Sequence, residues 1–289
     1  MRINHNISAM NTYRQYNTNT VNTNKAMEKL SSGLRINRAA DDAAGLSISE
    51  KMRSQIRGLT QATRNAQDGV SFIQTAEGAL NEVSDMLTRM KELAVQVKNG
   101  TYSTYDQANI TSELKALGTA ISDIYTETKF NGTQVFGEQT STTVGNDKRL
   151  NTVSAGTAAT IYYGEDGGQS VDIKTATTTN LVTLTAITLA GNEITTTHKE
   201  TFVGSVEDAI NEVNTTRAAY GAWQNQLEHA ANNMATTKEN LQAAEARVRD
   251  VDMAEEMMAY TKNNILLQAS QAMLAQANAQ PQGVLQLLQ

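Results

Sequence analysis

A long stripe of apolar residues between Met52 and Val97 constrains the fold of this chain more than any other feature. The apolar positions recur at steps of three and four, which places them on one face of an α-helix. At ~1.5 Å per residue the helix would be roughly 70 Å long, and Asn99-Gly100 marks its end. The stretch therefore predicts a coiled-coil-like rod. Its members are Met52, Ile56, Leu59, Ala66, Val70, Ile73, Leu80, Val83, Leu87, Met90, Ala94 and Val97.

Two further helical stretches flank a segment of different character. The first has Ile110, Leu114, Leu117, Ile121 and Ile124 in register; the second runs from Val206 through Val251 and continues through Met258, Ile265, Ala269, Ala272 and Met273. Between them, residues 137–204 are rich in Thr and Gly, with strand-like runs at Ser170–Lys174 and Leu181–Leu189 and a turn at Tyr162–Ser170. The order helix, β insert, helix predicts a mainly α fold. We expect a helical hairpin whose arms lie side by side and whose tip carries the insert.

The first 24 residues carry few large apolar side chains apart from tyrosines, namely Ile3, Ile7, Met10 and Val21. Burying these four would contribute roughly 6–12 kcal/mol at ~1.5–3 each. Ordering each backbone residue costs ~1–2 kcal/mol, so the entropy wins. The segment is therefore expected to be disordered in an isolated chain and to fold only against a partner surface.

Composition excludes several classes of function. The net charge of −6 and the pI near 5.2 give no basic field for nucleic acid or anionic lipid. The chain has no cysteine, which excludes thiol catalysis and disulfides. The first residues lack a cleaved secretory signal, and no run reaches the length of a membrane span. A cytosolic protein and a protein exported by a signal-independent route both fit these observations.

The residues that could carry catalysis do not form a recognisable site. The histidines, His5, His198 and His229, are scattered, and no nucleophile, phosphate-loop or dinucleotide motif is present. Asp41 and Asp42 are adjacent, so on a helix they point in different directions. Helix-end charges or ion pairs are the better interpretation for them, and also for Asp250 and Asp252 beside Arg247 and Arg249. We expect no enzyme activity, no metal and no cofactor.

The methionine-rich segment "DMAEEMMAY" (Asp252–Tyr260) has two interpretations. It can be a promiscuous binding face, because methionine side chains adapt to irregular surfaces. It can also be ordinary helix-packing material. The two interpretations merge if the packing partner is another subunit.

Several long segments resemble bacterial flagellin. They are "SSGLRINRAADDAAGLSISEKMRSQIRGL" (Ser31–Leu59), "NAQDGVSFIQTAEGALNEVSDMLTRMKELAVQ" (Asn65–Gln96), "TKFNGTQVF" (Thr128–Phe136), "RAAYGAWQNQLEHAANNMATTKENLQAAEARVRDVDMAEE" (Arg217–Glu256) and "ILLQASQAMLAQANAQPQGVLQLL" (Ile265–Leu288). The resemblance covers roughly residues 1–136 and 205–289, and its segments are dense and colinear at both ends. The middle of the chain matches nothing specific.

The resemblance implies a structural subunit that assembles with copies of itself into the helical flagellar filament, outside the cell. It implies an N-terminal inner coiled-coil arm and joint (1–44), two parts of a rod domain (45–136 and 205–251), a variable β-rich outer domain (137–204) and a C-terminal inner arm (252–289). It also implies passage of the unfolded chain through the flagellar type III export apparatus with an export chaperone. The chain would fold beneath a cap protein at the tip, in a filament that begins at hook–filament junction proteins.

In this light the cluster after Ser31 reads as a joint between arm and rod and as a subunit contact. Gly33 and Gly45 would give backbone freedom. Small residues, Ala39, Ala40, Ala43 and Ala44, would permit close approach. The charged residues Arg35, Arg38, Asp41 and Asp42 would pair within or between subunits.

The resemblance also implies recognition by host receptors. It places the centre of a Toll-like receptor 5 epitope at Arg89, Leu93 and Glu113, with Leu93 as an apolar anchor between charged flanks. The same surface is expected to be buried between subunits in the filament. The C-terminal residues Val284, Leu285, Leu287 and Leu288 resemble the tail read by NAIP-type receptors and would pack in the inner tube.

Three alternatives compete with the filament subunit. A hook–filament junction protein shares the terminal arms, but it does not usually carry the rod-helix match from Asn65 to Gln96. A cytosolic coiled-coil adaptor would form a small oligomer and no filaments. An enzyme has the least support, because the histidines are dispersed and no nucleophile motif is present.

Overall fold

The computed structural model describes residues 6–99, 101–136, 142–144, 147–149, 157–164, 168–174 and 199–287. The chain divides into two compact units. We call residues 1–56 with 239–289 the terminal unit, and residues 57–238 the central unit. The predicted run Leu181–Leu189 lies outside the described residues.

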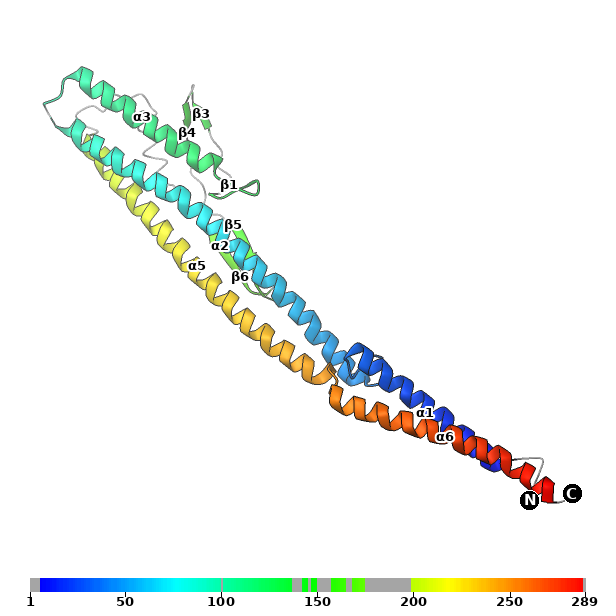
Figure 1. Ribbon diagram of the computed structural model, residues 1–289. Coiled ribbons are helices and arrows are strands. Elements are labelled where there is room, and N and C mark those ends of the chain that lie inside the picture. Colours follow the sequence, from blue (N-terminus) through cyan, green and yellow to red (C-terminus); the bar gives the residue numbers. More distant parts are fainter. Residues whose placement is uncertain are drawn as a thin grey trace. The chain divides into compact units, whose positions relative to one another are not determined.

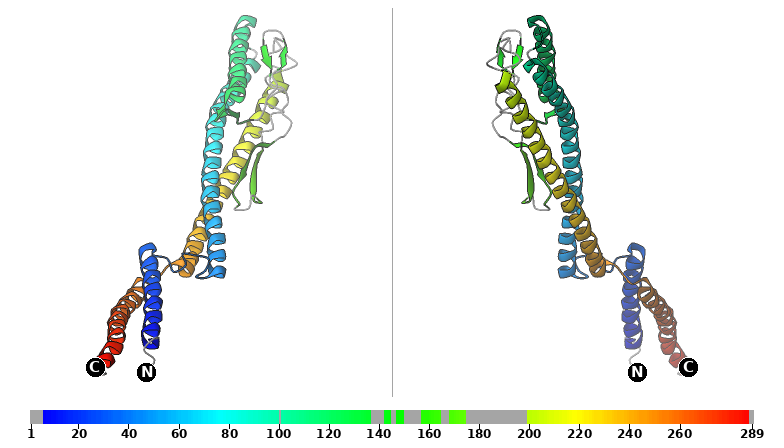
Figure 2. Two further views of the ribbon diagram at one scale, coloured as in Figure 1. Left: turned by 90° about the vertical axis from the view of Figure 1, so that its right-hand side faces the viewer. Right: turned by 90° about the vertical axis from the view of Figure 1, so that its left-hand side faces the viewer.

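In the terminal unit, two helices run antiparallel, α1 (Ile7–Ser32) and α6 (Met253–Leu287) (Figures 1 and 2). Each has a clear start signal. The side chain of Asn6 accepts a hydrogen bond from Ala9 N at the start of α1, and Asp252 Oδ1 accepts from Ala254 N at the start of α6. Helix α1 ends at Gly33, which adopts the left-handed conformation with φ of 71°.

The N-terminal segment departs from its predicted disorder. Helix α1 is formed from Ile7 onward and packs on α6 of the same chain. The expectation of disorder was wrong for the described residues. The partner surface that the segment was expected to need is supplied by α6 of the same chain. The contact is thin: the buried hydrophobic residues of the described terminal unit are Ala26, Ile36 and Ala277.

The central unit contains the core. It is built from most of α2 (Ala43–Lys98), from α3 (Thr104–Glu127) and from the first part of α5 (Lys199–Arg249). Helix α3 begins with a capping box between Ser103 and Asp106. Figure 1 shows α3 folded back beside α2. The predicted stripe on α2 is buried almost continuously from Leu59 to Val97.

Three two-stranded antiparallel sheets make up the described β structure. The first, β1 (Lys129–Phe130) with β2 (Thr133–Gln134), turns at Asn131 and Gly132, whose φ values are 49° and 82°. These positive φ values suit a tight hairpin turn. The others are β3 (Thr142–Val144) with β4 (Asp147–Arg149), and β5 (Thr157–Tyr162) with β6 (Ser170–Lys174).

The sequence predicted that the β insert lies at the tip of the helical hairpin. The β5–β6 hairpin departs from that prediction. It packs partway along α2, where Asn65 Nδ2 donates to Tyr162 O at 3.1 Å. A Cβ atom on Gly69 would lie 3.0 Å from Leu227 Cδ1 and 3.1 Å from Ile161 Cγ1, so the absent side chain makes room for both neighbours. Burial of Val171 and Ile173 holds the hairpin in place. The predicted fold class, mainly α with a β-rich insert, is confirmed.

Candidate functional site

The paired helices α1 and α6 present the first candidate surface. Their contact is polar on the α1 side: Asn6 Nδ2 donates to Ala277 O at 2.8 Å, and Asn19 Nδ2 donates to Ser270 Oγ at 2.9 Å. Lys29 pairs with Glu256 at 3.8 Å. These contacts fix the antiparallel register of the pair while they bury little apolar surface.

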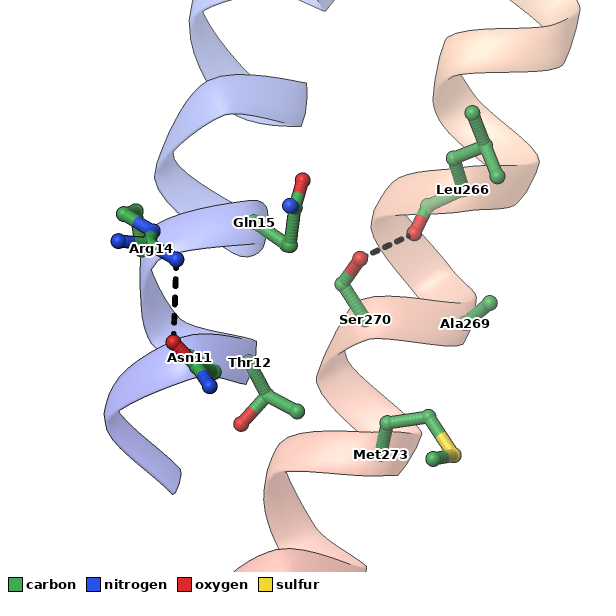
Figure 3. Close-up of a pocket in the computed structure, with 8 residues that line it drawn as sticks. All are labelled: Asn11, Thr12, Arg14, Gln15, Leu266, Ala269, Ser270 and Met273. Carbon is green, nitrogen blue, oxygen red and sulfur yellow. Dashed lines mark hydrogen bonds between the residues drawn. The ribbon is translucent and has the colours of Figure 1, made fainter. Parts of the chain in front are cut away.

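A groove of about 450 Å³ runs between the two helices (Figure 3). Polar side chains of α1 line one wall, and Leu266, Ala269, Ser270 and Met273 of α6 line the other. Ser270 donates to the carbonyl of Leu266 at 2.7 Å and therefore points along its own helix. The groove is open, with an apolar wall and a polar wall.

The apolar face of the pair is exposed. The periodic C-terminal residues that the sequence placed on one helical face include Met258, Ile265 and Met273, which are 68%, 61% and 59% exposed. On α1, Met10 and Val21 are 68% and 52% exposed. Such a face is a mark of an interaction surface, because monomeric proteins rarely expose large contiguous apolar patches.

The joint is the second candidate surface. Two chain connections meet there: residues 33–42 between α1 and α2, and residues 250–252 between α5 and α6. Leu34 and Asp250 form an isolated antiparallel bridge. Arg35 N donates to Arg249 O at 2.7 Å, and Val251 N donates to Gly33 O at 3.1 Å. The two connections are thus joined by backbone hydrogen bonds.

The four charged residues predicted at the joint do not pair with one another through their side chains. The two arginines bind Glu28 and a backbone carbonyl, and the two aspartates bind backbone amides. Arg38 forms a two-pronged pair with Glu28 at 2.9 and 3.1 Å, and Arg35 donates to Val248 O at 2.6 Å. Asp41 Oδ2 accepts from the amides of Asn37 and Arg38, and Asp42 Oδ1 accepts from Gly45 N.

These hydrogen bonds have electrostatic consequences. The pKa of Asp41 is held below its ordinary value, mainly by the hydrogen bond that its carboxylate accepts from the backbone amide of Arg38. The hydrogen bond to Glu28 raises the pKa of Arg38. Asp42 therefore acts as a helix-end charge at the start of α2, whereas Asp41 closes the turn that precedes it.

The two glycines of the joint have different roles. Gly33 needs its left-handed φ, as the sequence predicted. Gly45 does not have a positive φ, so backbone freedom is the wrong reason for it. A Cβ there would lie 2.5 Å from Asp42 Oδ2 and 2.8 Å from Ile36 Cδ1, which shows that its lack of a side chain is what matters.

We therefore expect the change Gly45→Ala to destabilise the terminal unit by about 1–3 kcal/mol, because the new methyl group overlaps the buried Ile36 side chain. Thermal unfolding followed by circular dichroism measures the effect. Gly78→Ala is the matched control on the same helix: nothing lies within 4 Å of its Cβ, and stability should rise by up to about 1 kcal/mol. Equal melting temperatures for the two variants would contradict this role of Gly45.

Sequence reasoning missed an ion pair beside the joint. Arg249 Nη1 binds Glu50 Oε1 at 2.9 Å, and its side chain is 14% exposed. Arg53 also binds Glu50 at 2.9 Å. The only local signal was Asp250-Val-Asp252, which reads as a helix stop followed by a new N-cap.

The hydrogen bond from Arg249, with a smaller contribution from Arg53, holds the pKa of Glu50 below its ordinary value of 4.5. Because the folded-state pKa is lowered, the associated stabilisation is present above the unfolded value and is lost as the pH falls through the folded value. We expect an NMR titration of the Glu50 carboxyl carbon to show a midpoint below 4.5. In Arg249→Gln the midpoint should move up, and a smaller shift is expected in Arg53→Gln. An unchanged midpoint in Arg249→Gln would show that the pair does not set this pKa.

The third candidate surface lies on the central unit. Arg89 binds Glu113 of α3 at 3.0 Å and Glu92 at 3.0 Å, and its side chain is 51% exposed. Glu92, followed by Glu113, raises the pKa of Arg89. Leu93, for which the resemblance implied an apolar anchor, is only 2% exposed in the monomer. The residue faces the helix–helix core, because it lies on the same face of α2 as the buried residues Met90 and Val97.

The remaining predicted sites lie at the margin of the structure. The backbone of α6 is described through Leu287, but the side chains of Val284, Leu285 and Leu287 are not. Leu288 lies outside the described residues. In the described parts of the chain, no group of three or more His, Asp or Glu residues is placed to hold a metal ion. No helix among the residues searched is long and apolar enough to cross a membrane.

Comparison with known proteins identifies the class. Residues 3–141 match the bacterial flagellin N-terminal helical region, and residues 203–288 match the bacterial flagellin C-terminal helical region. Flagellin of Halalkalibacterium halodurans is 50% identical and flagellin of Bacillus subtilis is 48% identical, in both cases over 100% of each chain. The flagellar filament 33 kDa core protein of Treponema phagedenis is 45% identical with the same coverage.

Two solved structures are also similar. Bacillus cereus flagellin is 32% identical, covering 59% of this chain and 88% of that one, with a TM-score of 0.45. A putative flagellar hook-associated protein from Vibrio parahaemolyticus covers 73% of this chain and 100% of that one, with a TM-score of 0.58. Its identity of 15% shows a shared fold and nothing further.

The matches to the two flagellin helical regions and to the full-length relatives define a helical structural protein. The chain belongs to the bacterial flagellin family. The predicted family is thereby confirmed, and the junction-protein and adaptor alternatives lose their support.

Proposed function

We propose that this chain is the structural subunit of a bacterial flagellar filament, which it builds outside the cell by self-assembly. The observation that carries the proposal is the exposed apolar face of α1 and α6 in a member of the flagellin family. Other copies of the chain would bury that face. Contacts between unlike surfaces of identical subunits that do not close into a ring generate a helical filament.

The weak internal packing of the terminal unit supports this role. Its described hydrophobic core contains two alanines and Ile36. The central unit instead buries a long apolar stripe and aromatic contacts, such as the one between Tyr125 and Phe136, whose ring centroids lie 4.6 Å apart. Segments with few buried apolar contacts are the least stable parts of a protein. The arms therefore gain most of their stability when neighbouring subunits cover them. The domain boundaries at 44, 136, 204 and 251 remain part of this proposal.

The joint is proposed to connect arm and rod and to contact neighbouring subunits. Its support is the pairing of the two chain connections through Leu34 and Asp250. The small residues Ala39, Ala40, Ala43 and Ala44 are exposed and leave room for a close neighbour. The charges already bound within the chain, such as Arg38 with Glu28, fix the joint before any neighbour arrives.

Export is proposed to follow the flagellar type III route, with the chain unfolded, escorted by an export chaperone and folded beneath the cap protein at the filament tip. Hook–filament junction proteins would supply the first subunit contacts. The absence of cysteine fits this route, since no disulfide could form before passage through a narrow channel.

Recognition by Toll-like receptor 5 is proposed for the monomer, through the surface of Arg89 and Glu113. Both side chains are about half exposed, at 51% and 47%, so a receptor can reach them. Leu93 would act by holding α2 in the helix–helix core rather than by touching the receptor. The C-terminal residues Val284, Leu285, Leu287 and Leu288 are proposed as inner-tube packing residues and as the element read by NAIP-type receptors.

Seeded polymerisation tests the central proposal. Purified monomer is mixed with short filament fragments or a precipitating salt and is imaged by negative-stain microscopy. Long uniform tubes are expected from the full chain. Deletion of residues 1–24 should prevent their formation while the central helices remain intact by circular dichroism. Small oligomers alone, under every condition, would overturn the filament proposal.

A further inference from the structure

Two sets of methionines lie at the extremes of exposure, and Met52 and Met86 lie between them. Six of them are 49% to 68% exposed, and all six lie on α1 or α6 of the terminal unit. They are Met10, Met27, Met253, Met257, Met258 and Met273, here called the arm methionines. In contrast, Met90 and Met234 of the central unit are 0% and 6% exposed.

We propose that the arm methionines are a modification site for two-electron oxidants of the hydroperoxide class, and that their conversion to sulfoxides weakens self-assembly. The consequence for assembly rests on the proposed function. The modification itself depends only on the exposure of the thioethers.

The reaction needs no further group. The methionine sulfur attacks one oxygen of hydrogen peroxide, so that an S–O bond forms and the O–O bond breaks. The departing hydroxide takes up the proton of the transferred oxygen and leaves as water. Sulfur is oxidised by two electrons and the peroxide is reduced to water. Because the chain has no cysteine, these thioethers do not compete with thiols for the oxidant.

The surface of α6 makes the sulfur atoms accessible. Met257 and Met258 line a shallow hollow together with Thr261, Lys262 and Ile265. Met273 is one of the residues that line the groove between α1 and α6 (Figure 3). An oxidant as small as hydrogen peroxide reaches sulfur atoms in such positions directly. In the core, neighbouring side chains cover Met90 completely.

Oxidation changes what the arm surface can bind. A sulfoxide turns a flexible apolar side chain into a polar one with a strong hydrogen-bond acceptor. Burial of that acceptor in an apolar contact, without a donor, is unfavourable. The face formed by Met258, Ile265 and Met273 would therefore lose its fit to a second copy of the chain.

The site is tested first without assembly. Purified full-length monomer is treated with graded hydrogen peroxide, and peptide mapping by mass spectrometry measures oxygen addition at each methionine. The arm methionines are expected to react at least about ten times faster than Met90 and Met234, because reactivity follows exposure. Equal rates for the two sets would overturn the site.

The consequence is tested by the critical concentration for seeded assembly, measured by sedimentation. Oxidised monomer is expected to need at least about a tenfold higher concentration, equivalent to about 1.4 kcal/mol. Incubation with methionine sulfoxide reductases should restore the original value. Assembly of fully oxidised monomer at an unchanged concentration would overturn the consequence.

Two leucine variants complete the test, since leucine matches methionine in volume and helix propensity. For a variant with all six arm methionines changed to leucine, peroxide treatment should leave the critical concentration of that variant unchanged. The control Met90→Leu with Met234→Leu should remain sensitive. Peroxide sensitivity of the six-leucine variant would show that another group is responsible. Failure of the untreated chain to assemble would contradict the proposed function instead, and peptide mapping would still decide the modification site.

Discussion

Replacement of Ile265 by aspartate is expected to abolish filament assembly while the monomer remains folded. The side chain is 61% exposed on α6, so the monomer loses little packing. In a subunit contact the carboxylate would be buried among apolar side chains without a partner, which costs several kcal/mol. The critical concentration should therefore rise by at least about a hundredfold.

Sedimentation after seeding measures this change, and circular dichroism checks that the helices and the melting temperature are kept. Ile265→Leu is the matched control, because it keeps an apolar side chain of the same size at the same position. It should assemble at nearly the original concentration. If Ile265→Asp formed filaments as readily as the unmodified chain, the exposed face of α6 would not be a subunit contact.

Sequence periodicity predicted the helices well, but it predicted burial well only in the central unit. On α2 the apolar stripe is covered by other helices of the same chain, and Leu80, Val83 and Leu87 are fully buried. On α6 the same kind of spacing left Met258 and Ile265 exposed. Periodicity shows which face of a helix is apolar. It does not show whether the surface that covers this face belongs to the same chain.

The joint shows a second limit. Asp42 could be read as a helix-end charge, because its carboxylate caps an amide only three positions further along the chain. The ion pair between Arg249 and Glu50 joins residues 199 positions apart, and no local sequence pattern predicts such a pair. Gly45 was singled out for the wrong reason, since the space beside Ile36 depends on how the joint folds.

The roles proposed for Arg89 and Leu93 in receptor binding can be separated by two alanine substitutions. Leu93 is 2% exposed, so Leu93→Ala should lower the free energy of unfolding by about 2–5 kcal/mol through the cavity that it leaves. Arg89 is half exposed, so Arg89→Ala should leave the melting temperature nearly unchanged. Loss of its charge should weaken binding of the monomer to Toll-like receptor 5 by about tenfold or more, as for an arginine at the centre of an interface.

Chemical denaturation measures the first effect, and surface-immobilised receptor ectodomain measures the second. Lys91→Ala is the control for charge, because Lys91 lies two positions along α2 and pairs with Glu207 of α5 rather than with α3. It should bind the receptor like the unmodified chain. Below its unfolding transition, Leu93→Ala should also bind with nearly the original affinity, since the leucine only supports the helices. Weaker binding by a fully folded Leu93→Ala would mean that the side chain leaves the core and reaches the receptor. Unchanged binding by Arg89→Ala would place the receptor surface elsewhere on the molecule.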